Sequence, residues 1–331
     1  MIATLLHDED LQAVREITAR DRSNLYLTSQ FLRDEERYQA FLAMYAVMRV
    51  IDDAVDKVED KQHLAPAQRA DLHHSLEGWS ARIQDAYRGA PADAPLDRAL
   101  AWAVARFPVP LMLWQRFVEA MHFDVDHPRF DRFETFLDYA EGATVAPTTI
   151  YIYLLTCEAG DDGKHQVHRF DYQSCGRELG LFAYLAHVLR DVRNDALVGS
   201  TGLVYLSTAD LASCDLVDRD LRRFAEARRS DGRFARAVQL LVERARAFEA
   251  RGVALVEQVL PRLPPDRCFV LRLIVAYYQE MLQRVADPGL DLFAVEEVMG
   301  TSDKLAIAAR VADAAGFRLD PETLLQAARP S

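Results

Sequence analysis

Two pairs of aspartates stand four residues apart in segments with helical periodicity: Asp52 with Asp56, and Asp191 with Asp195. His187 precedes Asp191 by the same step. Residues four apart lie on one face of an α-helix, so each pair brings two carboxylates together. Carboxylates held this close repel one another, and burying them unpaired is costly. A divalent cation removes that cost, and oxygen-rich aspartate sites suit Mg²⁺, which also shares substrate phosphates.

Both pairs continue the apolar face of their segment. The stripes that lead into them are Phe41, Tyr45 and Met48 for the first pair, and Leu181, Tyr184 and Val188 for the second. A solvated helix face would explain either pair alone, but two such pairs beside Arg49 and Arg190 favour a metal site. The sequence contains no GxGxxG, P-loop, GxSxG or HExxH motif that would indicate another chemistry.

Helical periodicity dominates the chain, and alternating β-branched runs are nearly absent. The pattern predicts helices at 8–20, 33–58, 66–88, 94–106, 109–122, 132–158, 171–198, 218–229, 231–259, 264–286, 302–315 and 320–328. There is no Gly/Ser linker or low-complexity tract, so we expect an all-α fold with residues 1–331 in one domain. The glycine-bearing segment 197–210, directly after the second aspartate pair, is a candidate lid.

The composition of the 331 residues is that of a globular protein with a sizeable core, since 50% are hydrophobic and 27% are charged. A net charge of −12 argues against general nucleic-acid binding, which needs a basic face. The four cysteines form no CxxC pair and are expected to be free thiols in a reducing compartment. With no signal-peptide pattern and no run of eighteen apolar residues, we expect a cytoplasmic protein.

Four segments resemble, in order, those of the squalene/phytoene synthase family: NLYLTSQFL (24–32), YAVMRVIDDAVD (45–56), LGLFAYLAHVLRDVRNDALVGSTGLVYLS (179–207) and YYQEMLQRVADPGLDLF (277–293). The resemblance implies an isoprenoid synthase fold, with helices around a central apolar cavity. It also implies a head-to-head prenyltransferase that joins two farnesyl or geranylgeranyl diphosphates with release of diphosphate. Mg²⁺, with Mn²⁺ as an alternative, would bridge the aspartates to the diphosphates. The product, of squalene, dehydrosqualene or phytoene type, and any use of NADPH stay open.

The same resemblance assigns roles to individual residues. It implies metal ligands at Asp52, Asp53, Asp56, Asp191 and Asp195, and diphosphate-binding, flap or other substrate-binding positions at Arg49, Tyr45, Arg190, Tyr139, Tyr184, Tyr205, Tyr278 and Lys304. Tyr45 and Tyr278 are equally explained as core tyrosines with satisfied hydroxyls. An ion pair with Asp53 is a rival explanation for Arg49.

Three features depart from the family pattern. His187 stands where the family has an asparagine that supplies an oxygen to the metal, so it is either a ligand through its imidazole or a hydrogen-bond partner of Asp191 or the diphosphate. Pro147 lies inside the helix expected at 132–158 and should kink it. The flap lacks both family arginines, a loss for which Arg190 and Arg193 could compensate.

Two alternatives to the prenyltransferase stay open. One is a class I terpene cyclase or diphosphate-ionising lyase that acts on a single prenyl diphosphate. The other is a non-catalytic lipid-binding protein of the same fold, which has no reason to bury aspartates. Apolar products would imply transient contact with a membrane surface, and the sequence leaves the oligomeric state open.

Overall fold

The computed structural model describes residues 5–20, 23–56, 58, 61–126, 129–160, 164–167, 169–199 and 202–320. Its α-helices are α1 (Asp8–Thr18), α2 (Asn24–Ser29), α3 (Glu35–Asp56), α4 (Pro66–Arg88), α5 (Pro95–Arg106), α6 (Leu111–Asp126), α7 (Phe133–Ala140), α8 (Ala146–Thr156), α9 (Tyr172–Asp195), α10 (Thr208–Ser213), α11 (Asp218–Ala227), α12 (Gly232–Val259), α13 (Pro265–Val285) and α14 (Thr301–Ala315). Short helical turns are η1 (Lys61–His63), the π-helical η2 (Glu141–Val145) and η3 (Leu260–Arg262). The only strands within the described residues are β1 (Glu158–Ala159) and β2 (His165–Gln166), an antiparallel pair.

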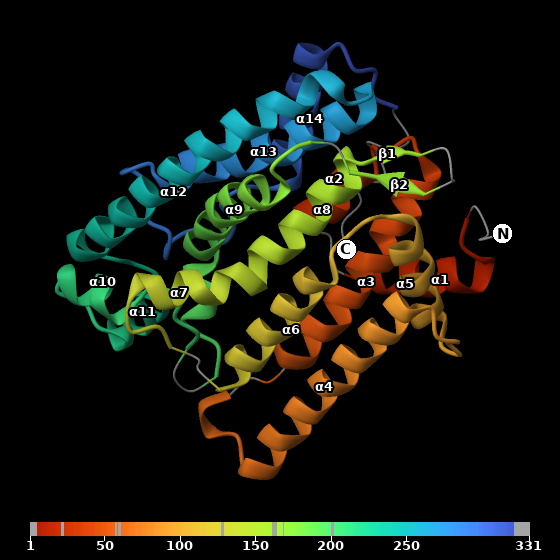
Figure 1. Ribbon diagram of the computed structural model, residues 1–331. Coiled ribbons are helices and arrows are strands. Elements are labelled where there is room, and N and C mark those ends of the chain that lie inside the picture. Colours follow the sequence, from red (N-terminus) through yellow and green to blue (C-terminus); the bar gives the residue numbers. More distant parts are fainter. Residues whose placement is uncertain are drawn as a thin grey trace.

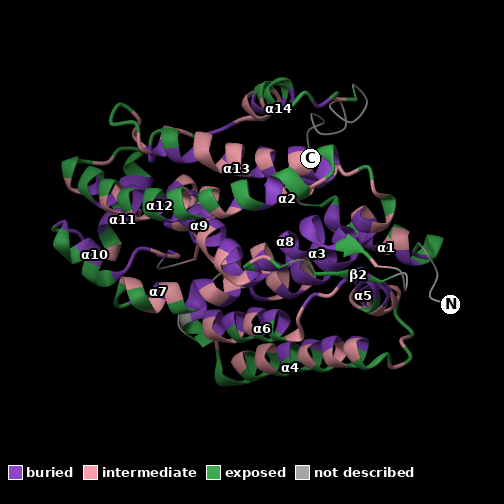
Figure 2. Ribbon diagram, turned by 45° about the horizontal axis from the view of Figure 1, so that its top comes forward, coloured by how far each residue is buried: buried purple, intermediate pink, exposed green. Residues whose placement is uncertain are grey.

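Helices α3, α8 and α9 form the centre of the molecule (Figure 1). The long α9 packs against α12 on one side and α8 on the other, while α3 packs against α1, α5 and α6. Figure 2 shows the central helices largely buried, whereas α4, α10 and α14 carry exposed faces. This arrangement confirms the all-α prediction. Among the described residues, no helix is both long enough and apolar enough to cross a bilayer.

The helix expected at 132–158 is instead three successive pieces: α7, the π-helical η2 and α8. Pro147 is the second residue of α8, directly after the π-helical turn. Proline has no backbone N–H and its ring crowds the preceding turn, so a regular helix cannot continue through it. The expected disturbance is therefore present, and it takes the form of a π-helical turn, a distortion that is frequent at functional sites.

Other differences from the expected helices concern short elements. The six-residue helices α2 and α10 are absent from the sequence-based list because such short segments carry less than two turns of apolar periodicity. Helix α3 begins at Glu35 and ends at Asp56, inside the expected 33–58. Of the helix expected at 320–328, only residue 320 lies within the described residues, and it is not helical.

Two glycines allow helices to approach closely around η2 and α8. A Cβ atom at Gly142 would lie 2.1 Å from the carbonyl oxygen of Arg116 on α6. A Cβ at Gly176 on α9 would lie 2.0 Å from Oγ1 of Thr149 on α8. Only glycine fits at such contacts, so these positions fix how tightly α6, α8 and α9 pack.

The buried carboxyl end of α8 is held by two arginines. Arg37 from α3, 1% exposed, donates to the carbonyl oxygens of Leu154 and Cys157. Arg267 from α13 donates to Leu155 O at 3.2 Å and Cys157 O at 2.9 Å. Cations complement the negative end of a helix dipole and satisfy its last carbonyls. The contacts tie α8 to α3 and α13, the helices that flank it around the candidate site.

Candidate active site

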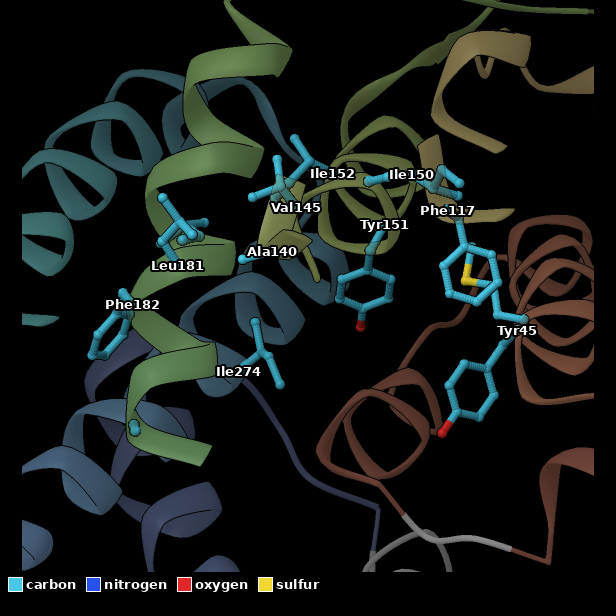
Figure 3. Packing of buried hydrophobic residues seen from close by; sticks show 14 of the residues in the cluster. Tyr45, Phe117, Ala140, Val145, Ile150, Tyr151, Ile152, Leu181, Phe182 and Ile274 are labelled. Carbon is cyan, nitrogen blue, oxygen red and sulfur yellow. The ribbon is translucent and has the colours of Figure 1, made fainter. Parts of the chain in front are cut away.

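A cavity of about 580 Å³ lies between α3, α6, α8, α9 and α13, a volume within the usual range for sites that enclose a small molecule. Most of its wall is apolar or aromatic, and Figure 3 shows Tyr45, Tyr151 and Ile274 projecting from three different helices. The predicted residues that line it are Tyr45, Arg49, Asp52, Asp56, Tyr139, Tyr184, His187, Arg190, Asp191, Asp195, Tyr205 and Tyr278. Asp53 and Lys304 are not among the lining residues.

Both aspartate pairs reach this one cavity, from the carboxyl ends of α3 and α9. Burial, together with the charge of Asp56, raises the pKa of Asp52 to about 7. Burial, together with the charge of Asp191, raises the pKa of Asp195 to about 8, and Asp56 across the cavity adds to this rise. The raised pKa values indicate that burial and neighbouring negative charge outweigh the effect of the nearby arginines on these carboxylates.

The donor set fits Mg²⁺ or Mn²⁺, which prefer oxygen ligands. Within the described residues, no group of three or more acidic, histidine or cysteine side chains is close enough to hold a metal by itself. Mg²⁺ in phosphate-transfer sites is commonly bound by one or two carboxylates, with water and substrate phosphate completing the shell. Carboxylate pairs on two facing helices match that mode, in which the diphosphate completes the site.

His187 lies beside an ion pair at the start of the second row. Arg190 donates to Asp191, with Nε 2.6 Å from Oδ1. His187 Nε2 is 2.7 Å from Asp191 Oδ2 and 2.9 Å from Arg190 Nη2. Protonated Nε2 donates to the carboxylate, whereas unprotonated Nε2 accepts from the guanidinium. Burial raises the pKa of Asp191, but hydrogen bonds from Arg190 and His187 outweigh it and leave the pKa below its ordinary value.

Arg49 stands in the equivalent place beside the first row. It lines the cavity, donates to Asp52 at 2.8 Å and also forms an ion pair with Asp53. Arg49 therefore forms the ion pair with Asp53 that was the alternative explanation for it, and it also lines the cavity. Asp53 faces Arg49 and not the cavity, and Lys304 lies in the first turn of α14, so the structure does not bring these two residues to the site.

Tyrosines form the wall between the aspartate rows and the apolar part of the cavity. The ring of Tyr184 stacks on Phe136 with centroids 5.4 Å apart and meets Tyr205 edge-on at 6.0 Å. Burial raises the pKa of Tyr139, Tyr184 and Tyr205 well above the ordinary value, so all three are neutral phenols. The hydroxyl of Tyr45 lies 2.6 Å from Ser23 Oγ.

The segment expected to be a lid is described except for residues 200 and 201. After α9 the chain turns back on it, since Leu203 N donates to Asp195 O at 2.7 Å and Gly202 N donates to Val198 O at 2.9 Å. Gly202 has φ = +75°, a conformation that side chains disfavour. Val198, Leu203 and Tyr205 line the cavity, so the segment covers the end of the site beside Asp195.

Sequence reasoning missed a buried ion pair behind the first row, Lys61 with Asp124. Asp124 lies on the buried face of the apolar helix α6, and the argument that singled out Asp52 would have found it. Lys61, in η1, has no comparable signal because a lone lysine in a short polar segment is usually exposed. Tyr151 and the threonines 144 and 148 were also missed, since a run of apolar residues does not show which side chain faces a cavity.

Comparisons with known proteins identify related proteins. A family model described as squalene/phytoene synthase matches residues 18–303. Phytoene synthase 1 of Arabidopsis thaliana is 31% identical over 208 residues, which are 62% of this chain and 45% of that protein. Phytoene synthase of Cereibacter sphaeroides is 30% identical over 203 residues, which are 61% of this chain and 53% of that protein. The chain thus spans about half the length of these curated relatives.

Solved structures show the same fold. A dehydrosqualene synthase in complex with a ligand matches with a TM-score of 0.72 at 17% identity, covering 93% of this chain and 96% of that one. A squalene synthase from Alicyclobacillus acidocaldarius matches with a TM-score of 0.64 at 22% identity, covering 83% of this chain and 92% of that one. These likenesses confirm the predicted isoprenoid synthase fold.

Proposed function

The chain belongs to the squalene/phytoene synthase family, and on that premise we propose that it is a metal-dependent prenyltransferase that joins two prenyl diphosphates head to head. One observation carries the proposal. Asp52 and Asp56 from α3, and Asp191 and Asp195 from α9, line one cavity whose remaining wall is apolar and aromatic. A lipid-binding protein gains nothing from four partly buried carboxylates, whereas diphosphate departure requires the cations that they would hold.

The proposed reaction begins when one substrate loses diphosphate and becomes an allylic cation. Mg²⁺ or Mn²⁺ held by the four aspartates would supply positive charge to the departing diphosphate. Arg49 and Arg190 line the same end of the cavity, where their N–H groups can donate to diphosphate oxygens as negative charge develops. Since each arginine is already fixed by an aspartate, little reorganisation is needed on binding.

The rest of the cavity protects the cation. The faces of Tyr184, Tyr205 and Tyr139 offer negative electrostatic potential without an ionised oxygen that could trap it, because their phenols stay neutral. An apolar wall also excludes water. The double bond of the second substrate then attacks, a proton is lost, and a cyclopropylcarbinyl diphosphate forms. Its ionisation and rearrangement, with loss of a further proton, give a dehydrosqualene- or phytoene-type product; a squalene-type product instead requires hydride from NADPH.

The cavity wall at Tyr151 is expected to limit the length of the prenyl chain that the cavity accepts. A small apolar space of about 10 Å³ adjoins the main cavity and shares Leu25, Tyr45, Met48, Pro147 and Tyr151 with it. The Tyr151 hydroxyl is 3.1 Å from Thr28 Oγ1, which holds the ring across this boundary. Removing the ring in Tyr151→Ala should lengthen the cavity and raise the share of geranylgeranyl diphosphate used relative to farnesyl diphosphate. Tyr151→Phe, which keeps the ring, is the matched control.

The experiment that tests the function is incubation with farnesyl or geranylgeranyl diphosphate, Mg²⁺ or Mn²⁺, and with or without NADPH, followed by product identification by mass. We expect metal-dependent diphosphate release and a product with twice the carbon atoms of the substrate. A product with an unchanged carbon number would establish the single-substrate cyclase instead. Absence of any metal-dependent product would overturn both enzymatic functions.

We also propose that residues 1–331 act as one cytoplasmic domain with transient contact with a membrane surface, where a hydrocarbon product would be delivered. One contiguous core of buried side chains, from Leu6 to Phe317, supports the single domain. Co-sedimentation with lipid vesicles during turnover, compared with resting enzyme, tests the membrane contact.

A further inference from the structure

Asn24, the first residue of α2, has a buried side-chain amide that is unpaired within the described residues. The residue is 4% exposed, and neither Nδ2 nor Oδ1 forms a hydrogen bond there. Buried amides are almost always hydrogen-bonded, because an unpaired one lowers the stability of the fold. Gln39 on α3 shows the usual state, since it accepts from Leu6 N at 2.8 Å and donates to Glu35 Oε1 at 2.9 Å. The unpaired amide of Asn24 therefore calls for a functional explanation.

The amide of Asn24 faces Tyr278, a residue that lines the cavity. Helix α2 packs against α13, which carries Tyr278, and Asn24 itself is not among the lining residues. Burial raises the pKa of Tyr278, whereas Arg190 and the Asn24 amide lower it. An amide lowers the pKa of a phenol when its N–H points to the phenol oxygen, so Nδ2 is turned toward Tyr278. The two groups are thus neighbours, but they do not meet the geometry of a formed hydrogen bond.

Tyr278 lies at the end of the cavity where the diphosphate is proposed to bind. The charges of Arg190 and Asp191 act on its hydroxyl, and both residues line the same cavity. The Tyr45 hydroxyl already has a serine partner, whereas the Tyr278 hydroxyl has no formed hydrogen bond within the described residues. A phenol can accept one hydrogen bond and donate another, and donation to an ionised oxygen is the stronger kind. The Tyr278 hydroxyl is therefore placed to donate to a bound diphosphate.

We propose that Asn24 is a positioning residue whose Nδ2 donates to the Tyr278 hydroxyl oxygen and so directs the Tyr278 O–H toward a diphosphate oxygen. Hydrogen bonds of active sites often reach their full geometry only in the complex, which explains why the two groups stay unpaired in the ligand-free protein. Binding of diphosphate then pairs both groups at once. The inference rests on the proposed function, because that function assigns the diphosphate to this end of the cavity.

The test is calorimetric titration with inorganic diphosphate in the presence of Mg²⁺, which needs no turnover. Asn24→Leu keeps the approximate shape of the side chain without the amide and should weaken diphosphate binding about fivefold. Tyr278→Phe should weaken it by at least about fivefold as well. In the Tyr278→Phe background, adding Asn24→Leu should cost less than about 1.5-fold, because the hydroxyl through which Asn24 acts is already gone. A merely structural role of Asn24 would give no such coupling.

The melting temperature of the ligand-free protein supplies a second readout. Asn24→Leu removes an unpaired buried amide and should raise the melting temperature by about 2 °C while it weakens diphosphate binding. Gln39→Leu is the matched control, because it removes a buried amide that is hydrogen-bonded and does not line the cavity. It should lower the melting temperature by about 2 °C or more and leave diphosphate binding unchanged.

A second variant keeps the inference testable if Asn24→Leu does not fold. Asn24→Ala removes the amide without adding bulk and should weaken diphosphate binding by the same factor. Unchanged diphosphate affinity in these variants, or an equal loss in the Tyr278→Phe background, would overturn the inference, as would absence of diphosphate binding by the unaltered protein. Failure of the proposed function is recognised separately, by product analysis of the unaltered enzyme, since the titration does not depend on turnover.

Discussion

The two aspartate rows have the same spacing but differ in their electrostatic states. On α9, Asp191 is held by Arg190 and His187 and keeps its charge easily, while no ion pair to Asp195 is found within the described residues and its pKa is raised to about 8. On α3, both Asp52 and Asp56 have raised pKa values although Arg49 and Lys61 lie beside them. Equal spacing therefore does not give equal sites, because burial and neighbouring cations decide which carboxylate is ready to bind metal.

The largest contrast is expected within the α9 row. Asp195→Asn and Asp191→Asn should each lower product formation by at least about 100-fold, since each removes charge that faces the diphosphate. Their effects on the metal-free protein at pH 8 should have opposite signs. Asp195→Asn removes a poorly compensated charge and should raise the melting temperature by about 2 °C or more, whereas Asp191→Asn strands Arg190 and should lower it by a similar amount.

Differential scanning fluorimetry with EDTA measures both shifts. Asn194→Asp, a change at the exposed neighbouring position, is a control for an added charge at the end of α9. Equal destabilisation by Asp191→Asn and Asp195→Asn would remove the proposed difference between the two carboxylates.

The next largest contrast is expected between the two arginines beside the rows, whose substitution should lower turnover by different factors. Arg190→Gln removes the guanidinium that donates to Asp191 and contacts His187, and should reduce turnover by about 100-fold. Arg49→Gln should reduce it by about tenfold, since the first row retains Lys61. Steady-state kinetics at saturating Mg²⁺ gives both numbers. Lys→Gln or Arg→Gln changes on the exposed surface, such as Arg219→Gln, should have no effect.

The pH dependence of metal binding should report the raised pKa of one aspartate in each row. Asp52 and Asp195, with pKa values of about 7 and 8, bind protons that a metal must displace, so Mg²⁺ affinity should rise from pH 6 to 8.5 and then level off. The sign for stability is the reverse. The folded metal-free protein holds protons that the unfolded chain releases near pH 4, so its stability should fall as pH rises from 4 to 8.

Titration calorimetry in two buffers of different ionisation enthalpy measures the protons released with Mg²⁺, with diphosphate present. Asp195→Asn should lower that number at pH 7.5. Proton release unchanged by Asp195→Asn would show that Asp195 is already ionised.

The smallest effect on turnover is expected from substitution of His187. An asparagine amide can donate to Asp191 as the imidazole does, so His187→Asn should keep turnover within about fivefold. His187→Leu removes the hydrogen bond and should raise the Mg²⁺ concentration needed for half-maximal activity by a further few-fold. If His187→Asn abolishes turnover, the imidazole has a role of its own, as a metal ligand or in proton transfer.

Much of the fold and site could be predicted because helix geometry is local. The four-residue step of Asp52 and Asp56, together with the apolar residues before them, identified a carboxylate row at the end of α3, and the same reasoning identified α9. The roles of Asp53 as a metal ligand and Lys304 as a diphosphate-binding or flap residue came from the family pattern alone, and neither residue lines the cavity. Asp53 is one position beyond Asp52, and a one-residue step turns a side chain about 100° around the helix.

The sequence by itself determined the all-α class, the two aspartate rows and the disturbance at Pro147, because each depends on residues within a few turns of one helix. Only the tertiary structure decided that the rows face one cavity, that Asp191 and Asp195 differ in charge state, and that Lys61 reaches Asp124, which is 63 residues away in sequence. Such contacts depend on which helix faces meet and how closely they pack, and Gly142 and Gly176 permit that approach because they have no side chain where atoms of other helices lie. Helical spacing fixes which side chains share a face, and packing fixes what that face meets.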